Sequence, residues 1–270
     1  MCKELKGFSY TIGIYDVVCR DIRMKIQEEA KKEGPYGIGV FTDRYCEQEL
    51  MTRPMKSLEE RMEIAKCFEG VDFVFAVDSR NPKQNDEAAQ VAYEKYLEEN
   101  KKDEAAKKYK VGFVIGSFDV FHAGHLENLL LAKKMCEKLV VVLKTDERIM
   151  KNKNKSPRQS TAERASILSF MKPIDDILYM DIDTTRRDII SDVMDLYKGI
   201  EGKDIVAIFG SDLQKKEEVF LDTDWADINV VFTDRNPEKM KVVSSSNYQK
   251  ICDSNGGIEH LEKMEAENMR

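Results

Sequence analysis

The chain has 270 residues and a formal net charge of −7, and 42% of its residues are hydrophobic and 34% are charged. This composition is typical of a soluble, folded protein with room for two domains, and it excludes an intrinsically disordered chain. The acidic balance argues against a nucleic-acid-binding surface, because such surfaces carry an excess of basic residues.

The apolar runs of the sequence are short, and its cysteines are scattered. The run at 139–143 is far too short to span a bilayer, and the N-terminus lacks the apolar segment of a signal peptide. We therefore predict a cytoplasmic protein with no membrane partner. No two of the six cysteines have a metal-ligand spacing, so we expect reduced thiols. They are Cys2, Cys19, Cys46, Cys67, Cys136 and Cys252.

The predicted elements form two similar sets, because the sequence matches itself at an offset of 103 residues over about seventy positions. Ile12, Gly13, Asp16 and Val17 correspond to Ile115, Gly116, Asp119 and Val120. Further along, Ser57, Glu60, Arg61 and Ile64 correspond to Ser160, Glu163, Arg164 and Ile167. A constant offset over this length indicates an internal repeat.

Each copy is predicted to alternate strands and helices in the order β-α-β-α-β. In the second copy the expected elements are a strand at 111–116, a helix at about 124–137, a strand at 139–143, a helix at about 160–170 and a strand near 176–180. Two further strands, at 204–209 and 228–232, have no counterpart in the first copy, which is therefore truncated. This alternation predicts an α/β fold with a doubly wound parallel sheet, preceded by a shortened version of the same fold.

Four segments follow from this organisation: the first copy at 1–81, a charged helical linker at 82–110, the second copy at 111–254 and a charged tail at 255–270. The linker reads either as a solvated helix or as a helix whose apolar face covers the sheet edge left by the missing strands. That face would include Val91, Tyr93 and Leu97. We expect the tail to be frayed or to form a single exposed helix.

The stretch GSFDVFHAGH at 116–125 holds two of the three histidines of the chain. It joins a predicted strand to a predicted helix, at the edge of a parallel sheet where ligands bind. Two imidazoles at a helix N-terminus suit a polyphosphate, because both groups offer hydrogen-bond donors to charged oxygens. A capping or core role and a zinc site that both histidines share are the alternatives, although no third zinc ligand has a recognisable spacing.

These residues resemble the signature of the cytidylyltransferases in the HxGH nucleotidyltransferase superfamily, whose members share a Rossmann-like fold. Every fixed position is matched, by Gly116, Phe118, Asp119, His122, Gly124 and His125. The resemblance extends from about 109 to 251, and its pattern is most similar to that of the glycerol-3-phosphate cytidylyltransferases.

The resemblance implies a set of site residues. Catalysis is expected from His122, His125, Lys153 and Lys155, the last two in the run KNKNKSPR ahead of a helix. The nucleotide is expected at Gly116, Ser117, Phe118, Asp119, Gly124, Gly210, Asp212, Ser244 and Ser245. Arg235 and Arg164 are candidates for contact with the second substrate. Because Arg61 occupies the position equivalent to Arg164 in a copy without histidines, a structural ion pair explains Arg164 equally well.

The implied reaction is an in-line displacement at the α-phosphorus of a nucleoside triphosphate by the phosphate of a small phosphorylated alcohol or polyol, with release of pyrophosphate. CTP is the expected nucleotide, and Mg²⁺ is expected on the triphosphate rather than in a protein site. An adenylyltransferase that uses ATP is the alternative within the superfamily. A nucleotide-binding regulatory protein without turnover is the alternative from another class.

At the positions of GSFDVFHAGH the first copy reads GIYDVVCRDI. Cys19 and Ile22 replace the two histidines and Asp21 replaces the glycine, so this copy cannot donate to a polyphosphate and repels it. We predict that it is a degenerate, catalytically inactive copy. Cys19 is a poor candidate nucleophile because this copy has no histidine to activate it. The resemblance suggests that the inactive copy acts as an internal pseudo-dimer partner, with a homodimer of the whole chain as a further expectation.

Overall fold

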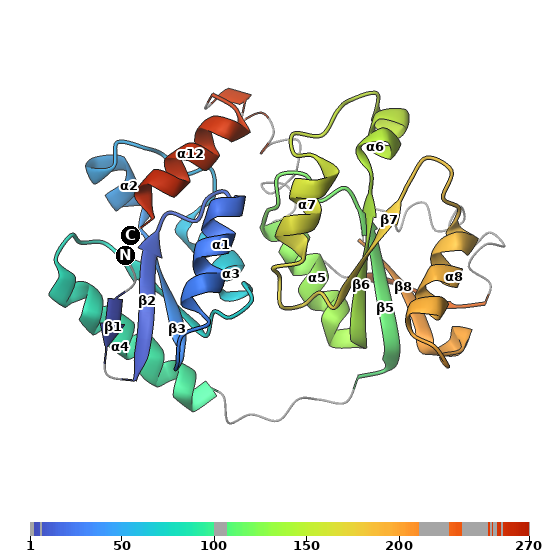
Figure 1. Ribbon diagram of the computed structural model, residues 1–270, viewed down its shortest axis with the longest axis horizontal. Helices are drawn as coiled ribbons and strands as arrows, with labels where there is room; N and C mark the ends of the chain where they lie inside the picture. The colour runs from blue at the N-terminus through green and yellow to red at the C-terminus, as the bar shows by residue number, and fades with distance from the viewer. Residues whose placement is uncertain are drawn as a thin grey trace. The chain divides into compact units, whose positions relative to one another are not determined.

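The computed structural model describes residues 3–5, 7–99, 107–210, 227–233, 248, 250, 253–254 and 256–269. The chain forms two compact units, one made of 1–104 with 245–270 and the other of 105–244 (Figure 1). Each unit is an α/β structure with its own sheet and core, as the repeated pattern predicts.

The sheet of the second unit has five parallel strands in the order β7-β6-β5-β8-β9. They are β5 (Tyr109–Gly116), β6 (Cys136–Lys144), β7 (Asp176–Met180), β8 (Ile205–Gly210) and β9 (Asn229–Thr233). The chain starts in the centre at β5, moves outward to β6 and β7, and returns to the other side of β5 for β8 and β9. This confirms the predicted doubly wound sheet and makes the carboxyl end of β5 its switch point.

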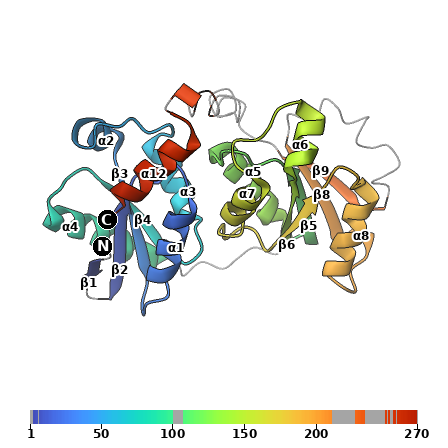
Figure 2. The same cartoon turned by 45° about the horizontal axis from the view of Figure 1, so that its top comes forward.

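Helices cover both faces of this sheet. Helices α5 (Ala123–Met135) and α7 (Thr161–Leu168) lie on one face, and α8 (Arg186–Leu196) lies on the other (Figures 1 and 2). Ile189 and Val193 of α8 are buried against Val140 and Val142 of β6 in one hydrophobic core cluster. A short 3₁₀ helix at Gly202–Asp204 leads into β8.

Two features of the second unit differ from the prediction. Helix α5 ends at Met135, because Cys136 is fully buried against the backbone of β5 and starts the next strand. A further helix, α6 (Asp146–Lys153), follows β6. Its first turn is capped by the Thr145 hydroxyl, which accepts from the backbone N–H of Arg148 (3.3 Å), and the left-handed Asn154 ends it.

The first unit has three parallel strands, β2 (Phe8–Gly13), β3 (Tyr36–Phe41) and β4 (Phe73–Val77). A fourth, β1 (Lys3–Leu5), pairs with β2 in antiparallel fashion and is absent from our prediction. The helices that follow β2 and β3 are α1 (Arg20–Glu29), α2 (Asp43–Glu49) and α3 (Leu58–Lys66).

The predicted linker and tail are both packed into the first unit. Tyr93 of α4 (Pro82–Glu99) packs on its core, as in the second of the two readings of the linker. Val91 and Leu97 are exposed at 68% and 46%, so their assignment to the covering face was wrong. The tail forms α12 (Ile258–Asn268), which lies beside α1 (Figure 1). Leu261 and Glu265 are buried, so the expectation of an exposed tail was also wrong. In the part of the chain described above, no helix is long and apolar enough to cross a membrane.

Candidate active site

The turn between β5 and α5 carries the two histidines. His122 is the N-cap of α5, with extended backbone geometry, and its Nδ1 accepts a hydrogen bond from the backbone N–H of Gly124 at 3.1 Å. Because Nδ1 accepts, the proton of a neutral His122 imidazole is on Nε2. The residue that caps the helix therefore keeps a hydrogen-bond donor on the other side of its ring.

The two imidazole rings stack on each other, with centroids 3.8 Å apart and planes at 21°. His125 lies one turn into α5, and its ring also contacts Phe118 at 5.2 Å and Phe121 at 5.6 Å between centroids. His122 is buried and His125 is half-buried. These contacts restrict both rings to fixed orientations, which is what preorganised hydrogen-bond donation requires.

The turn itself is tightly constrained. Phe118 has a positive φ of 51°, and its ring lies against Gly116, where an added Cβ would be 2.6 Å from the Phe118 Cε2 atom. Only glycine fits at this point without displacing the ring. The buried Asp119 carboxylate accepts from the backbone N–H groups of Arg158 (2.9 and 3.0 Å) and Gln159 (3.0 Å). Gly116 and Asp119 therefore shape the turn.

Arg164 of α7 is fully buried and fixes three chain segments together. Its Nε donates to the Gln159 carbonyl (3.0 Å), its Nη1 to the carbonyls of Ser117 (2.6 Å) and Lys144 (2.9 Å), and its Nη2 to the Asp146 carboxylate (2.6 Å). With all three guanidinium nitrogens used within the protein, the geometry supports the structural ion pair for Arg164 over contact with a second substrate.

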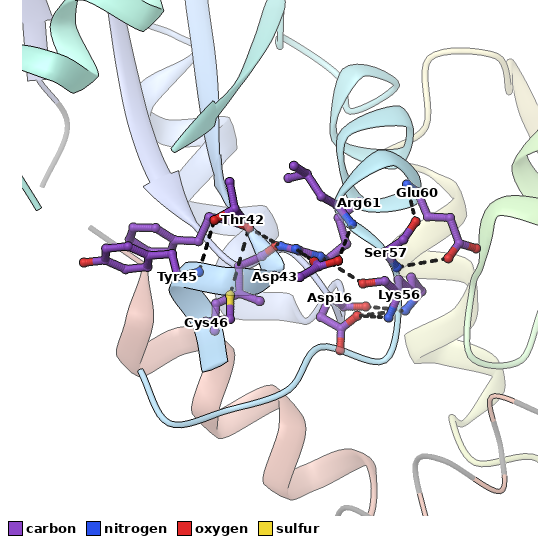
Figure 3. Close-up of polar contacts among 12 residues, drawn as sticks. Asp16, Thr42, Asp43, Tyr45, Cys46, Lys56, Ser57, Glu60 and Arg61 are labelled. Atoms are coloured by element: carbon purple, nitrogen blue, oxygen red, sulfur yellow. Dashed lines mark hydrogen bonds and ion pairs between the residues drawn. The ribbon is translucent and has the colours of Figure 1, made fainter. Parts of the chain in front are cut away.

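The first unit contains the same network, displaced by 103 residues in the sequence. Arg61 of α3 is fully buried and donates from Nε to the Lys56 carbonyl (3.1 Å), from Nη1 to the carbonyls of Ile14 (2.7 Å) and Phe41 (2.8 Å), and from Nη2 to Asp43 (Figure 3). Each partner is the residue 103 positions before the corresponding partner of Arg164. The arginine therefore serves the fold even where no histidine is present.

Asp16 repeats the role of Asp119 in the same way. Its carboxylate accepts from the backbone N–H groups of Met55 (2.7 Å) and Lys56 (2.8 Å), which correspond to Arg158 and Gln159 (Figure 3). The Asp position that the two sequences share therefore has a structural explanation that is independent of ligand binding.

The turn of the first unit differs in what surrounds its backbone. Cys19 is the N-cap of α1 but makes no side-chain cap hydrogen bond, and burial raises the pKa of its thiol. The Glu265 carboxyl group of α12 accepts from the backbone N–H groups of Tyr15 (2.9 Å), Asp16 and Val17 (3.0 Å). The first unit thus fills its turn with a side chain of its own, and Cys19 is held as a protonated thiol.

The predicted lysines lie on the β6 side of the histidine turn. Lys153 is the last residue of α6, Lys155 follows the helix end, and both side chains are exposed. We did not single out Lys144, the last residue of β6. Burial lowers the pKa of Lys144, and the nearby charges of Lys153 and Arg148 lower it further. The signal that could have revealed it was a lone lysine at the carboxyl end of an otherwise apolar strand.

The remaining predicted residues are only partly described. Gly210 ends β8, which neighbours β5, so it lies at the same edge of the sheet as Gly116. Asp212, Arg235, Ser244 and Ser245 lie outside the described residues, and their roles stay predictions. Among the described residues, no group of three or more His, Cys, Asp or Glu side chains is arranged to hold a metal ion.

A doubly wound parallel sheet with this histidine pair on the turn after its central strand defines the HxGH nucleotidyltransferase class. Residues 113–251, about half of the chain, match the cytidylyltransferase-like family. The chain belongs to this family.

Known relatives cover parts of the chain. The bifunctional protein HldE of Paramagnetospirillum magneticum is 42% identical over 79 residues, which are 29% of this chain and 16% of that protein. The FAD synthase of Pyrococcus horikoshii is 34% identical over 70 residues, 26% of this chain and 47% of that enzyme. The chain thus spans about a sixth and about half of these two relatives.

One solved structure that resembles the chain is the lipopolysaccharide core biosynthesis protein from Thermoplasma volcanium. The match has a TM-score of 0.33 and 22% identity, and it covers 47% of this chain and 98% of that one.

Proposed function

We propose that the protein transfers a nucleoside monophosphate, CMP from CTP, to the phosphate of a small phosphorylated alcohol or polyol. The observation that carries this proposal is the stacked pair His122 and His125 at the start of α5, with Nδ1 of His122 committed to the helix cap. Family membership supports nucleotidyl transfer, and the choice of CTP follows from the resemblance of GSFDVFHAGH to the cytidylyltransferase signature.

In the proposed reaction an oxygen of the acceptor phosphate attacks the α-phosphorus of the triphosphate. The new bond joins this oxygen to the α-phosphorus, the bond from the α-phosphorus to the bridging oxygen breaks, and pyrophosphate leaves with that electron pair. His122 donates from Nε2, and His125 donates from the adjacent ring, to phosphoryl oxygens as negative charge increases. The protein contributes positioning and charge stabilisation, and the reaction needs no covalent enzyme intermediate.

Magnesium is proposed to enter with the triphosphate. Mg²⁺ retains several waters and commonly binds substrate phosphates, so it needs few protein ligands. Asp119, the acidic residue of the histidine turn, already accepts three hydrogen bonds from backbone N–H groups. We therefore name no protein ligand for the ion.

ATP is the second candidate nucleotide. The relative named FAD synthase supports it, because the product in that name contains an adenylyl group joined through a diphosphate. The acceptor would then be a phosphorylated compound such as FMN, and the histidines would act in the same way.

We infer that the first unit is a degenerate copy of the second. The matched networks of Arg61 and Arg164 and of Asp16 and Asp119 support this origin, together with the constant offset between their partners. The replacement of both histidines and the occupation of the turn by Glu265 support its inactivity. The internal pseudo-dimer and the homodimer stay predictions.

The test is to incubate the protein and Mg²⁺ with each of CTP, ATP, GTP and UTP, paired with glycerol 3-phosphate, phosphoethanolamine, sugar phosphates or FMN, and to measure pyrophosphate release. Release with CTP and a phosphorylated alcohol supports the proposal, whereas release with ATP alone selects the second candidate. Specific nucleotide binding without release from any pair contradicts the proposal and favours the regulatory protein.

A further inference from the structure

Lys144 is a partly buried cation that has no anionic partner among the described residues. Its side chain lies on the same face of β6 as Val140 and Val142, because side chains alternate along a strand. Across the described residues, the Lys144 ammonium has no hydrogen bond or ion pair, and the charges that act on it are the cations Lys153 and Arg148. A folded protein rarely retains such an arrangement unless a ligand compensates the charge.

Arg148 is held in place by one part of its guanidinium group. Its Nη1 donates to the backbone carbonyls of Asp181 (3.2 Å) and Ile182 (2.5 Å), in the loop after β7. Its Nε is buried and, within the described part of the chain, has no hydrogen-bond partner. Nε and Nη2 form the edge of an arginine that binds an oxyanion through two parallel hydrogen bonds. The loop carbonyls therefore anchor the residue while this edge stays available.

The corresponding positions of the first unit contain no cation. Phe41 and Tyr45 stand 103 residues before Lys144 and Arg148, and their rings stack with centroids 4.5 Å apart and planes at 7°. In the first unit, therefore, an apolar pair packs at these positions, and the fold does not require a cation there. The presence of Lys144 and Arg148 at these positions of the second unit therefore needs an explanation other than folding.

The position of Lys144 connects these cations to the histidine turn. The backbone carbonyls of Lys144 and Ser117 both accept from the same atom, Nη1 of Arg164, so the end of β6 lies directly beside the turn. Strand β6 lies on one side of β5. Strand β8, which ends at Gly210, lies on the other side. A ligand at Lys144 would thus approach the turn from the side opposite the predicted nucleotide residue Gly210.

We propose that Lys144 and Arg148 bind the phosphate monoester of the acceptor substrate, with Lys153 at the rim. This inference rests on the proposed function and extends it to the second substrate. The acceptor would carry a phosphate dianion, because two cations that form no ion pair with any described residue select for charge. The same phosphate supplies the attacking oxygen, and the site holds it beside the turn that bears His122 and His125.

The kinetic test compares Lys144→Met and Arg148→Lys with Lys151→Met, an exposed lysine of α6 outside the cluster. Pyrophosphate release is measured at varied acceptor concentration with saturating triphosphate, and then at varied triphosphate concentration with saturating acceptor. We expect the KM for the acceptor to rise about 10- to 100-fold in both variants, the scale of a lost charged hydrogen bond, with the KM for the triphosphate within about twofold. An unchanged KM for the acceptor, or a rise confined to the triphosphate, overturns the inference.

A binding test separates this inference from the proposed function. Inorganic phosphate is titrated by calorimetry into the full-length protein and its variants, with thermal unfolding as the control for folding. We expect phosphate binding to weaken at least tenfold in Lys144→Met and to persist in Lys151→Met. If no substrate pair releases pyrophosphate and this pattern still holds, the proposed function fails and the phosphate site stands. If Lys144→Met binds phosphate like the wild type, the site fails.

Discussion

Arg61 and Arg164 lie 103 residues apart in the chain and donate to four equivalent partners, three of them backbone carbonyls. Both side chains are fully buried. In each unit the arginine connects the end of one parallel strand, β3 or β6, to the turn that follows the neighbouring strand, β2 or β5. It therefore acts as a structural residue in both units.

Replacing either arginine should lower stability. Arg164→Ala and Arg61→Ala each leave three carbonyls without their donor, so we expect a loss of about 3 kcal/mol or more of unfolding free energy. Urea unfolding followed by circular dichroism measures it. The fraction of Arg61→Ala that folds should have the same KM values as the wild type. A stable Arg164→Ala variant with an altered KM for the acceptor would instead show that Arg164 contacts the substrate.

Removal of a histidine should affect turnover rather than folding. We expect His125→Ala to lower kcat on the order of a hundredfold, the scale of one lost preorganised donor, with little change in thermal unfolding. The matched control is Cys19→Ala in the first unit, which should retain the wild-type kcat because its thiol is buried and protonated. A large loss of kcat in Cys19→Ala contradicts the assignment of an inactive first unit.

The glycine at the end of each central strand allows a paired comparison. In Gly116→Ala the added methyl group would be 2.6 Å from the Phe118 ring, which packs against His125. We expect kcat to fall at least tenfold because the ring must move and the histidine with it. In Gly13→Ala the methyl group would be 3.0 Å from the Tyr15 ring, so a small loss of stability and no change in kcat are expected. Steady-state kinetics with melting curves distinguish the two effects, and equal kcat losses would count against the histidine turn as the reaction site.

Glu265 should make the stability of the protein depend on pH. Burial raises the pKa of this carboxyl group to about 8, with a further contribution from Asp16. Between its ordinary value of 4.5 and about 8, the folded state holds a proton that the unfolded state has lost. The stabilisation is therefore complete below pH 4.5 and is lost as the pH rises to about 8.

Urea unfolding between pH 4.5 and 9 tests this behaviour. The wild type should lose stability across this range by more than Glu265→Gln, whose amide cannot ionise. Glu262→Gln, on the same helix, serves as the control. Parallel curves for the wild type and Glu265→Gln would show that the Glu265 carboxyl group keeps its ordinary pKa when folded.

Much of the fold was predictable from the sequence, and so was the position of the histidine turn at the end of a strand. The strands of the second unit have long apolar runs, and the histidine motif has a fixed spacing, so both are local signals. Helix α6 was missed because its short polar sequence reads as a charged loop, and only the Thr145 cap and the left-handed Asn154 mark its limits. Cys136 belongs to β6 rather than to the predicted helix because it packs against Gly112 of β5, and this is a tertiary contact.

The contacts of α12 and of Lys144 were not predictable for a similar reason. Nothing near Glu265 in the sequence indicates that its carboxyl group contacts the backbone of residues 15–17, some 250 positions away. Lys144 becomes informative only when the surrounding charges are known, because its significance is the lack of a described anionic partner. Long-range contacts of this kind depend on how the elements pack, and a pattern within one segment does not contain them.

Tracing the α-phosphorus shows whether the histidine turn of the second unit performs nucleotidyl transfer. The full-length protein is incubated with Mg²⁺, CTP labelled at the α-phosphate and the best phosphorylated alcohol, and the products are separated. We expect the label to move to the diphosphate-linked conjugate, pyrophosphate to be unlabelled, and His125→Ala to slow transfer about a hundredfold. Label bound covalently to the protein, or equal transfer by His125→Ala, would contradict it.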